Sequence, residues 1–346
     1  MINLFAPRYE DNKLHQHFKV LLKESAEPMR EVINSWAMGF IDRDKKFVKE
    51  FQTTFNSSFW ELYLYKAFKE LNMEVDFTNQ SPDFTVSTEQ NKKLSIEAVT
   101  ANSAESDEPE WSSEVLDKYL NKPRNEILEY ATIRLLNAIN SKHEKFLRQY
   151  GQKNHVKGNP FILAIAPFEQ PAFSRQNNQA LNRVLYACDA PSLNGIGSDG
   201  EILFKNKHIN TVTKSNGSAL KLGVFTTPNF KEISAVIFST TATFSKVIVQ
   251  GNIQNCMIQS RRYKCGDGWF GYIDQYSEKR VYKETHLDGL HIYYNSYAEN
   301  PLNREIFGSS EITHNFYNIE SKSMLSEHND GSLISRSTYW NYDKPS

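Results

Sequence analysis

The chain has 346 residues, of which 23% are charged, and its formal net charge is −1 at pH 7. This length allows two modest domains, or one core with a long extension. A near-neutral charge excludes a polyanion-binding surface spread over the whole molecule, so any nucleic-acid contact needs a local basic patch. No apolar run approaches the roughly 18 residues of a membrane span, and we expect no membrane partner.

Cysteine usage bears on the compartment. Cys188, Cys256 and Cys265 form no Cys-x-x-Cys pair, and their number is odd. This pattern predicts a reduced, cytoplasmic protein without a disulfide framework. The first ten residues show no basic start followed by an apolar segment, so we expect no signal peptide.

The predicted elements begin with helices. Apolar residues recur at helical spacing in residues 15–22 and 29–40, and we interpret residues 1–50 as a helical N-terminal extension. Residues 51–170 then predict a helix, three strands, a helix and a strand from their helical and alternating patterns. These elements are expected at residues 54–72, 73–77, 83–87, 94–100, 124–150 and 160–166.

Residues 171–346 predict a β-rich C-terminal region that can belong to the same globule. Apolar runs at residues 233–239, 246–250 and 290–294 predict strands. Residues 320–346 are polar, and we expect a loosely packed tail there. The fold class is therefore α/β, with a helical extension before the core and a mixed, β-rich region after it.

Three acids between residues 58 and 99 carry the strongest functional signal. Glu61 lies in the first core helix, Asp83 starts the second strand, and Glu97 lies inside an apolar strand. Burying the Glu97 carboxylate would cost several kcal/mol of folding free energy unless a cation or a proton compensates its charge. Carboxylates that converge at the end of a small sheet are typical of a Mg²⁺ site, where Mn²⁺ can substitute, and phosphate chemistry commonly uses such sites.

Each acid also has an explanation that requires no function. Ser58-x-x-Glu61 fits a capping box at the start of a helix. The tripeptide that ends in Asp83 is Ser-Pro-Asp, a common turn sequence. Glu97 would need no partner if its strand lay at the edge of the sheet, with the carboxylate in water.

The segment from about residue 52 to residue 168 resembles the catalytic core of the PD-(D/E)xK nuclease superfamily. The resemblance rests on Pro82-Asp83, on Glu97 and on the order of the elements. It implies a restriction-endonuclease-like αβββαβ core in which Asp83 and Glu97 bind the metal and Glu61 binds it through water. The third motif should read acid-x-Lys, but here it is Glu97-Ala98-Val99, and a valine cannot orient or deprotonate the attacking water.

Some superfamily members supply the missing cation from the following helix, and Lys142 is the candidate here. Lys142 lies three and four residues after Ile139 and Ala138, in the apolar row of its helix. The alternative is a lysine that extends its charged end to solvent. Arg134 lies on a similar face and could hold a phosphate. The turn lysines Lys92 and Lys93 are the third choice.

Two further groups are weaker. Arg261, Arg262 and Lys264 surround Tyr263 and form the best local candidate for contact with a nucleic-acid backbone, although a solvated loop is the favoured explanation. His286 and His291 could take part in a metal cluster, but we expect ordinary surface histidines.

The leading hypothesis is a Mg²⁺-dependent endonuclease that hydrolyses phosphodiester bonds, with DNA favoured over RNA, in restriction or defence. Its catalytic residues would be Glu61, Asp83, Glu97 and Lys142, and a homodimer is compatible with this function. The alternative is a catalytically inactive nucleic-acid-binding protein with a degenerate nuclease fold. A third hypothesis, an unrelated α/β scaffold or interaction protein, predicts an exposed Glu97 and separated acids.

Overall fold

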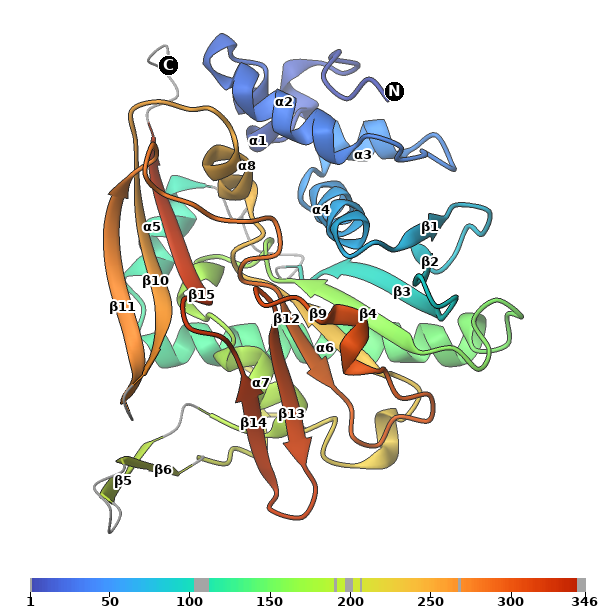
Figure 1. The fold of residues 1–346 in the computed structure, drawn as a ribbon, viewed down its shortest axis with the longest axis vertical. Helices are drawn as coiled ribbons and strands as arrows, with labels where there is room; N and C mark the ends of the chain where they lie inside the picture. Colours follow the sequence, from blue (N-terminus) through green and yellow to red (C-terminus); the bar gives the residue numbers. More distant parts are fainter. Residues whose placement is uncertain are drawn as a thin grey trace.

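The computed structural model describes residues 2–102, 112–189, 192–196, 202–205, 207–266 and 269–340. Its centre is one large mixed sheet with helices on both faces, which makes the fold α/β (Figure 1). The sheet has eight strands in the order β1-β2-β3-β4-β9-β12-β13-β14. Their bounds are Glu74–Asp76, Phe84–Ser87, Lys93–Thr100, Phe161–Ala166, Ala235–Phe238, His291–Tyr294, Thr313–Asn318 and Ser323–Glu327.

Strand directions divide the sheet. β1, β2 and β3 form an antiparallel meander, while β3, β4 and β9 run parallel to one another. β12 is antiparallel to β9 and parallel to β13, and β14 closes the far edge as an antiparallel strand. Strands from residues 171–346 thus continue the sheet that β1 to β4 begin.

The helices lie in two layers. The described residues form the helices α1 to α8 at Gln16–Leu21, Glu27–Trp36, Phe47–Thr53, Asn56–Glu70, Ser113–Leu120, Arg124–Lys145, Gln179–Tyr186 and Phe244–Gln250. α1 to α4 and α8 share one hydrophobic cluster with Ile96 of β3 and Ile162 of β4. α6 and α7 share a second cluster, on the other face, with Leu163 of β4. Alternation along each strand therefore supplies both layers with apolar side chains.

The expected order of a helix, three strands, a helix and a strand is present as α4, β1, β2, β3, α6 and β4, with the short α5 before α6. α4 is fixed to the sheet by Trp60, whose indole Nε1 donates to the Ala164 carbonyl at 3.0 Å. α6 ends at Lys145, and a wider helical turn, Phe146–Tyr150, continues it. α4 and α6 lie on opposite faces of the sheet at β3 and β4, because they belong to the two different hydrophobic clusters.

Two predictions for the C-terminal region are wrong. Residues 246–250 belong to the helix α8 and not to a strand, because a short apolar run fits a buried helix as well as a strand.

Lys246 in this helix is fully buried and contacts Glu284, which the Arg336 guanidinium also contacts at 3.0 Å. Burial alone would raise the pKa of Glu284, but Arg336 and Lys246 outweigh it and hold that pKa at about 2.

The expected loose tail is also ordered from Ser323 to Trp340. β14 completes the main sheet, and β15 (Leu333–Trp340) pairs with β10 (Cys256–Gly266). β11 (Trp269–Glu278) pairs with the other edge of β10 to form a separate three-stranded sheet. Two short ribbons, β5–β6 and β7–β8, complete the strands, at Ser192–Ile196, Ile202–Lys205, Thr211–Thr213 and Ala219–Lys221. Among the described residues, no helix combines the length and the apolar character that crossing a membrane requires.

Candidate functional site

Glu97 lies in the interior of the sheet, on the face that α6 covers. β3 pairs with β2 on one side and with β4 on the other, where Glu97 is opposite Leu163. The Glu97 side chain is 2% exposed. The alternative of an edge strand with the carboxylate in water is therefore wrong, and so is the exposed Glu97 that the scaffold hypothesis predicts.

Three side chains from α6 and its last turn converge on one oxygen of Glu97. The Lys142 Nζ lies 2.7 Å from Glu97 Oε1, and the Lys145 Nζ lies 3.0 Å from the same atom. The Tyr150 hydroxyl donates to Oε1 at 3.2 Å. The other oxygen, Oε2, is buried and has no hydrogen-bond partner. A buried carboxylate oxygen without a donor is rare, because its desolvation is not repaid.

Asp83 lies beside Glu97 at the start of β2. It follows the cis Ser81–Pro82 peptide, and its Oδ2 accepts a hydrogen bond from the Ala98 amide at 2.8 Å. Burial and then the charge of Glu97 raise the pKa of Asp83 to about 6, although Lys142 and Lys145 oppose the shift. Burial is thus the larger cause of the raised pKa, and repulsion from Glu97 adds to it.

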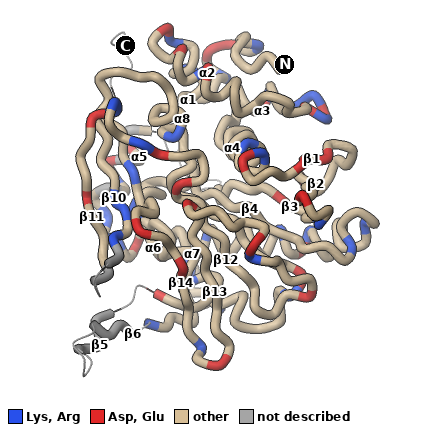
Figure 2. The backbone as a smooth tube through the Cα atoms, viewed as in Figure 1, with Lys and Arg blue, Asp and Glu red and all other residues tan. Residues whose placement is uncertain are grey.

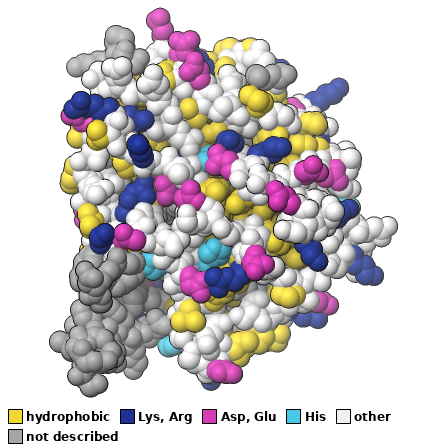
Figure 3. Space-filling view, viewed as in Figure 1, with side chains coloured by type: hydrophobic (Ala, Val, Ile, Leu, Met, Phe, Trp, Pro, Cys, Tyr) yellow, Lys and Arg dark blue, Asp and Glu magenta, His cyan; other side chains and the backbone are white. Residues whose placement is uncertain are grey.

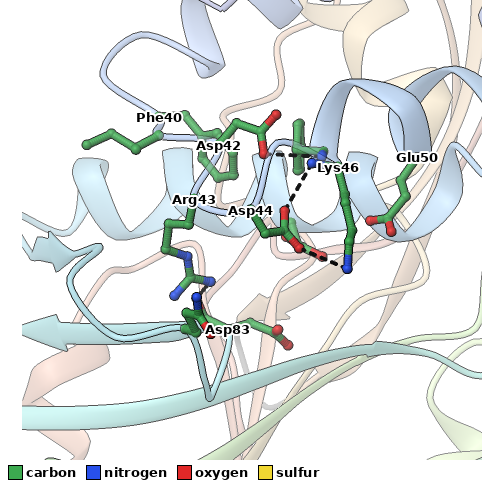
Figure 4. Close-up of a pocket in the computed structure, with 11 residues that line it drawn as sticks. Phe40, Asp42, Arg43, Asp44, Lys46, Glu50 and Asp83 are labelled. Carbon is green, nitrogen blue, oxygen red and sulfur yellow. Dashed lines mark hydrogen bonds and ion pairs between the residues drawn. The ribbon is translucent and has the colours of Figure 1, made fainter.

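Glu61 reaches the same region from α4. Ser58 lies inside α4, which begins at Asn56, so Ser58 is not the N-cap and the capping box is wrong. Burial raises the pKa of Glu61 well above its ordinary value, and the charges of Asp83 and Glu50 raise it further. Glu61 and Asp83 line one cavity of about 550 Å³ under the loop that precedes α3, together with Glu50, whereas Glu97 is not among its lining residues (Figure 4).

Arg43 closes this cavity from the N-terminal extension. Its guanidinium donates to the Asp83 carbonyl at 2.7 Å and also to the Asn79 carbonyl (Figure 4). Arg43 is therefore the cation that fixes the backbone just before β2. Sequence reasoning missed Arg43 because nothing in its local pattern connects residue 43 with residue 83.

Lys145 and Tyr150 were also missed, although the sequence contained a signal for Lys145. It lies three residues after Lys142, so the two share a helix face. Tyr150 reaches Glu97 only because the wider turn at the end of α6 carries it back towards the sheet. Burial and the charges of Glu97 and Asp83 raise the pKa of Tyr150 well above its ordinary value, so its hydroxyl stays protonated and donates.

The remaining predicted basic residues lie elsewhere. Arg134 Nε donates to the Asn102 carbonyl beyond the end of β3 at 2.6 Å. Lys92 and Lys93 are exposed at the β2–β3 turn. The three cations of β10 each contact a carboxylate: Arg261 with Asp274 at 2.7 Å, Arg262 with Asp288 at 3.3 Å and Lys264 with Asp330 at 3.2 Å. Their contact with nucleic acid stays a prediction.

The expectation of surface histidines is wrong. His286 and His291 are both 3% exposed. Burial lowers the pKa of each to about 3, so both are neutral. His286 bonds to the Tyr63 carbonyl through Nε2 at 2.9 Å, which gives it a structural role between α4 and the segment before β12.

The carboxylates suit a metal that needs few protein ligands. In the part of the chain that the structure describes, no three His, Cys, Asp or Glu side chains are grouped so that they could hold a metal ion. Mg²⁺ usually keeps several waters and is bound by one or two carboxylates together with substrate phosphates. Asp83 and Glu97, with the unpartnered Oε2, fit that requirement. Comparison with protein-family models, with curated proteins and with solved structures found no match to this chain.

The raised pKa of Asp83 predicts how stability depends on pH. Its folded pKa of about 6 exceeds the ordinary 3.8, so the folded protein binds this proton more tightly than the unfolded chain does. The resulting stabilisation is present below the ordinary pKa and is lost as the pH rises through about 6. We expect Asp83→Asn to raise the free energy of unfolding by about 1–2 kcal/mol near pH 7.5 without metal, and to change little near pH 4.

Urea denaturation in EDTA at the two pH values measures this effect. Asp76→Asn is the matched control, because hydrogen bonds from Thr78 lower the pKa of Asp76 and its replacement should destabilise the protein at the higher pH. If Asp83→Asn also destabilised the protein there, the two acids would not repel each other as described.

Proposed function

We propose that this protein is a Mg²⁺-dependent nuclease with a divergent PD-(D/E)xK core, and that it cleaves phosphodiester bonds in DNA. One observation carries the proposal. Glu97 is buried in a central strand, next to Asp83, whose pKa is raised. Its Oε1 contacts the amines of Lys142 and Lys145, and its Oε2 has no hydrogen-bond partner. An ordinary core strand would not bury this group, because an isolated carboxylate there is costly.

Asp83 and Glu97 would hold the metal directly, and Glu61 would reach it through water. When bound, Mg²⁺ would polarise the scissile phosphate and make water a better nucleophile. Mn²⁺ takes the same oxygen ligands and should replace it. Arg43 keeps the Asp83 backbone in place, and Tyr150 orients Glu97 through Oε1.

Lys142 would take the place of the missing motif lysine. Lys142 comes from α6 instead of β3. Its Nζ contacts the Glu97 carboxylate, beside which a motif lysine at position 99 would lie. Lys142 is 22% exposed and so can approach a phosphate from the solvent side while it stays beside Glu97. Its role would be to stabilise the negative charge that develops on the phosphate. Lys145 contacts Glu97 as well and would hold it when Lys142 turns towards substrate.

The second candidate function is an inactive nucleic-acid-binding protein. Val99 stands where the motif lysine belongs, and both nearby lysines are occupied by Glu97. A Glu97 that serves only as the anion of an ion-pair cluster would account for these contacts without chemistry. DNA binding without cleavage would favour this function.

A cleavage assay decides between the two. Purified protein is incubated with supercoiled, linear and single-stranded DNA and with RNA, in Mg²⁺, in Mn²⁺ and in EDTA. The nuclease proposal expects products with either metal and none in EDTA. Intact substrates under every condition, from a preparation that binds DNA, would support the inactive protein instead. Restriction or defence is the biological setting we propose.

A further inference from the structure

A concentration of positive charge lies directly beside the Glu97 site. Residues 142–157 contain five Lys or Arg residues and a single acid, Glu144, in a chain whose net charge is −1. We call the four most outward cations the basic ridge. They are Lys145, Arg148, Lys153 and Lys157. Figure 2 shows Lys and Arg on the segment that follows α6 and projects beyond β3 and β4.

The outer part of the basic ridge is open to solvent, while Lys145 and Lys153 are half-buried. The Arg148 side chain is 72% exposed, Lys157 is exposed, and Lys145 is 38% exposed. Arg148 contacts Glu144 at 3.9 Å, a long contact between two exposed groups that contributes little free energy. Figure 3 shows Lys and Arg side chains at the same edge of the molecule, below a group of Asp and Glu side chains.

Two contacts join the ridge to the candidate site. The Lys153 Nζ donates to Ser81 Oγ at 2.6 Å, two residues before Asp83. The Lys145 Nζ contacts Glu97 at 3.0 Å. The ridge therefore begins at the two proposed metal ligands and runs outward along the end of α6 and the segment after it.

The end of a helix attracts lysines by itself, because the helix dipole favours cations at its C-terminus. This explains Lys142 and Lys145 within the last turn of α6. It does not explain Lys153 and Lys157, which follow α6 by eight and twelve residues as counted from its end at Lys145. A favourable dipole acts only within about the last turn.

We propose that the basic ridge binds the phosphodiester backbone of a nucleic-acid duplex and directs it into the Glu97 site. The proposal rests on the nuclease function proposed above and names the surface that holds its substrate. Exposed Lys and Arg side chains bind phosphates by charge and release condensed counterions, so the affinity falls steeply with salt. A protein of near-neutral net charge needs such a local surface, because its overall field does not attract DNA.

The test is a salt titration of binding. Fluorescent duplex DNA and duplex RNA are titrated in EDTA with the wild-type protein and with the double variant Arg148→Ala/Lys157→Ala. Neither residue touches Glu97 or Asp83 in any contact described above. The control, Lys13→Ala/Arg280→Ala, removes one exposed Lys and one exposed Arg that pair locally with Glu10 and Glu278. Thermal unfolding of all three proteins verifies that they fold.

We expect the ridge variant to bind about tenfold more weakly at low salt, with a salt slope smaller by about 2, one for each lost phosphate contact. The control should bind as the wild type does. The duplex that shows the larger loss identifies the nucleic acid. Equal binding by the ridge variant and the wild type, an equal loss in the control, or no duplex binding at all would overturn the proposal.

Binding in EDTA does not depend on cleavage, so the two proposals fail separately. A ridge-dependent duplex complex that is never cut in Mg²⁺ contradicts the nuclease function and leaves the ridge as a binding surface. If the ridge variant binds and cleaves duplexes as the wild type does, the basic ridge is not the binding surface, and the nuclease function still stands.

Discussion

Glu97→Gln should reduce metal-dependent cleavage at least about a thousandfold, because it removes a proposed metal ligand and the charge that pairs with Lys142. Glutamine keeps the shape of the side chain, so the change tests charge and not packing. The free energy of unfolding should fall by about 1–3 kcal/mol, since Lys142 and Lys145 lose their anion but are exposed enough to turn to water. Initial cleavage rates and urea denaturation measure the two effects separately.

Glu232→Gln is the matched control for this substitution. Glu232 contacts His143 of α6 at 2.9 Å and is 20% exposed, so this substitution removes a carboxylate contact with the same helix without touching the site. Its cleavage rate should match the wild type. A Glu97→Gln variant that cleaves normally and is only less stable would mean that Glu97 serves solely in an ion-pair cluster.

Lys142→Ala should slow cleavage about 10²- to 10³-fold and leave folding nearly intact. It removes a cation that would stabilise charge in the transition state, while Lys145 and Tyr150 still donate to Glu97 Oε1. Binding of Mn²⁺ should persist, because the carboxylates remain. Single-turnover cleavage rates, Mn²⁺ titration and thermal unfolding measure these three properties.

Lys66→Ala controls for the loss of a half-buried lysine, since Lys66 pairs with Glu70 on α4 at 3.2 Å and is 33% exposed. It should cleave as the wild type does. Full activity in Lys142→Ala would refute a lysine supplied by α6, and Lys145→Ala would then show whether the neighbouring lysine acts in its place.

The core strands β2 and β3 could be predicted because apolar and polar residue types alternate along them, although several of the polar positions are buried as well. Phe84 and Val86 of β2 and Ile96 of β3 are buried on one face, as an alternating pattern requires. The run at residues 246–250 could not be assigned, because a short apolar segment has no period long enough to separate helix from strand. The β10–β11–β15 sheet was missed because its strands are polar and partly exposed.

The candidate site shows a similar division. The neighbourhood of Asp83, Glu97 and Lys142 could be predicted, because strand alternation and helix spacing determine which way Glu97 and Lys142 point. Arg43 could not, since its contact with Asp83 spans 40 residues and depends on how the N-terminal extension packs. Tyr150 depends on a wider turn at the end of α6, which no residue pattern specified.

A crystal structure with Mn²⁺, located by its anomalous scattering, tests directly whether Asp83 and Glu97 bind a metal. The proposed metal site predicts one strong peak within ligand distance, about 2.0–2.6 Å, of carboxylate oxygens from both Asp83 and Glu97, with Glu97 Oε2 among them. Well-ordered crystals at saturating Mn²⁺ with no peak there, and with Oε2 still without a partner, would contradict the metal site and the nuclease function that depends on it.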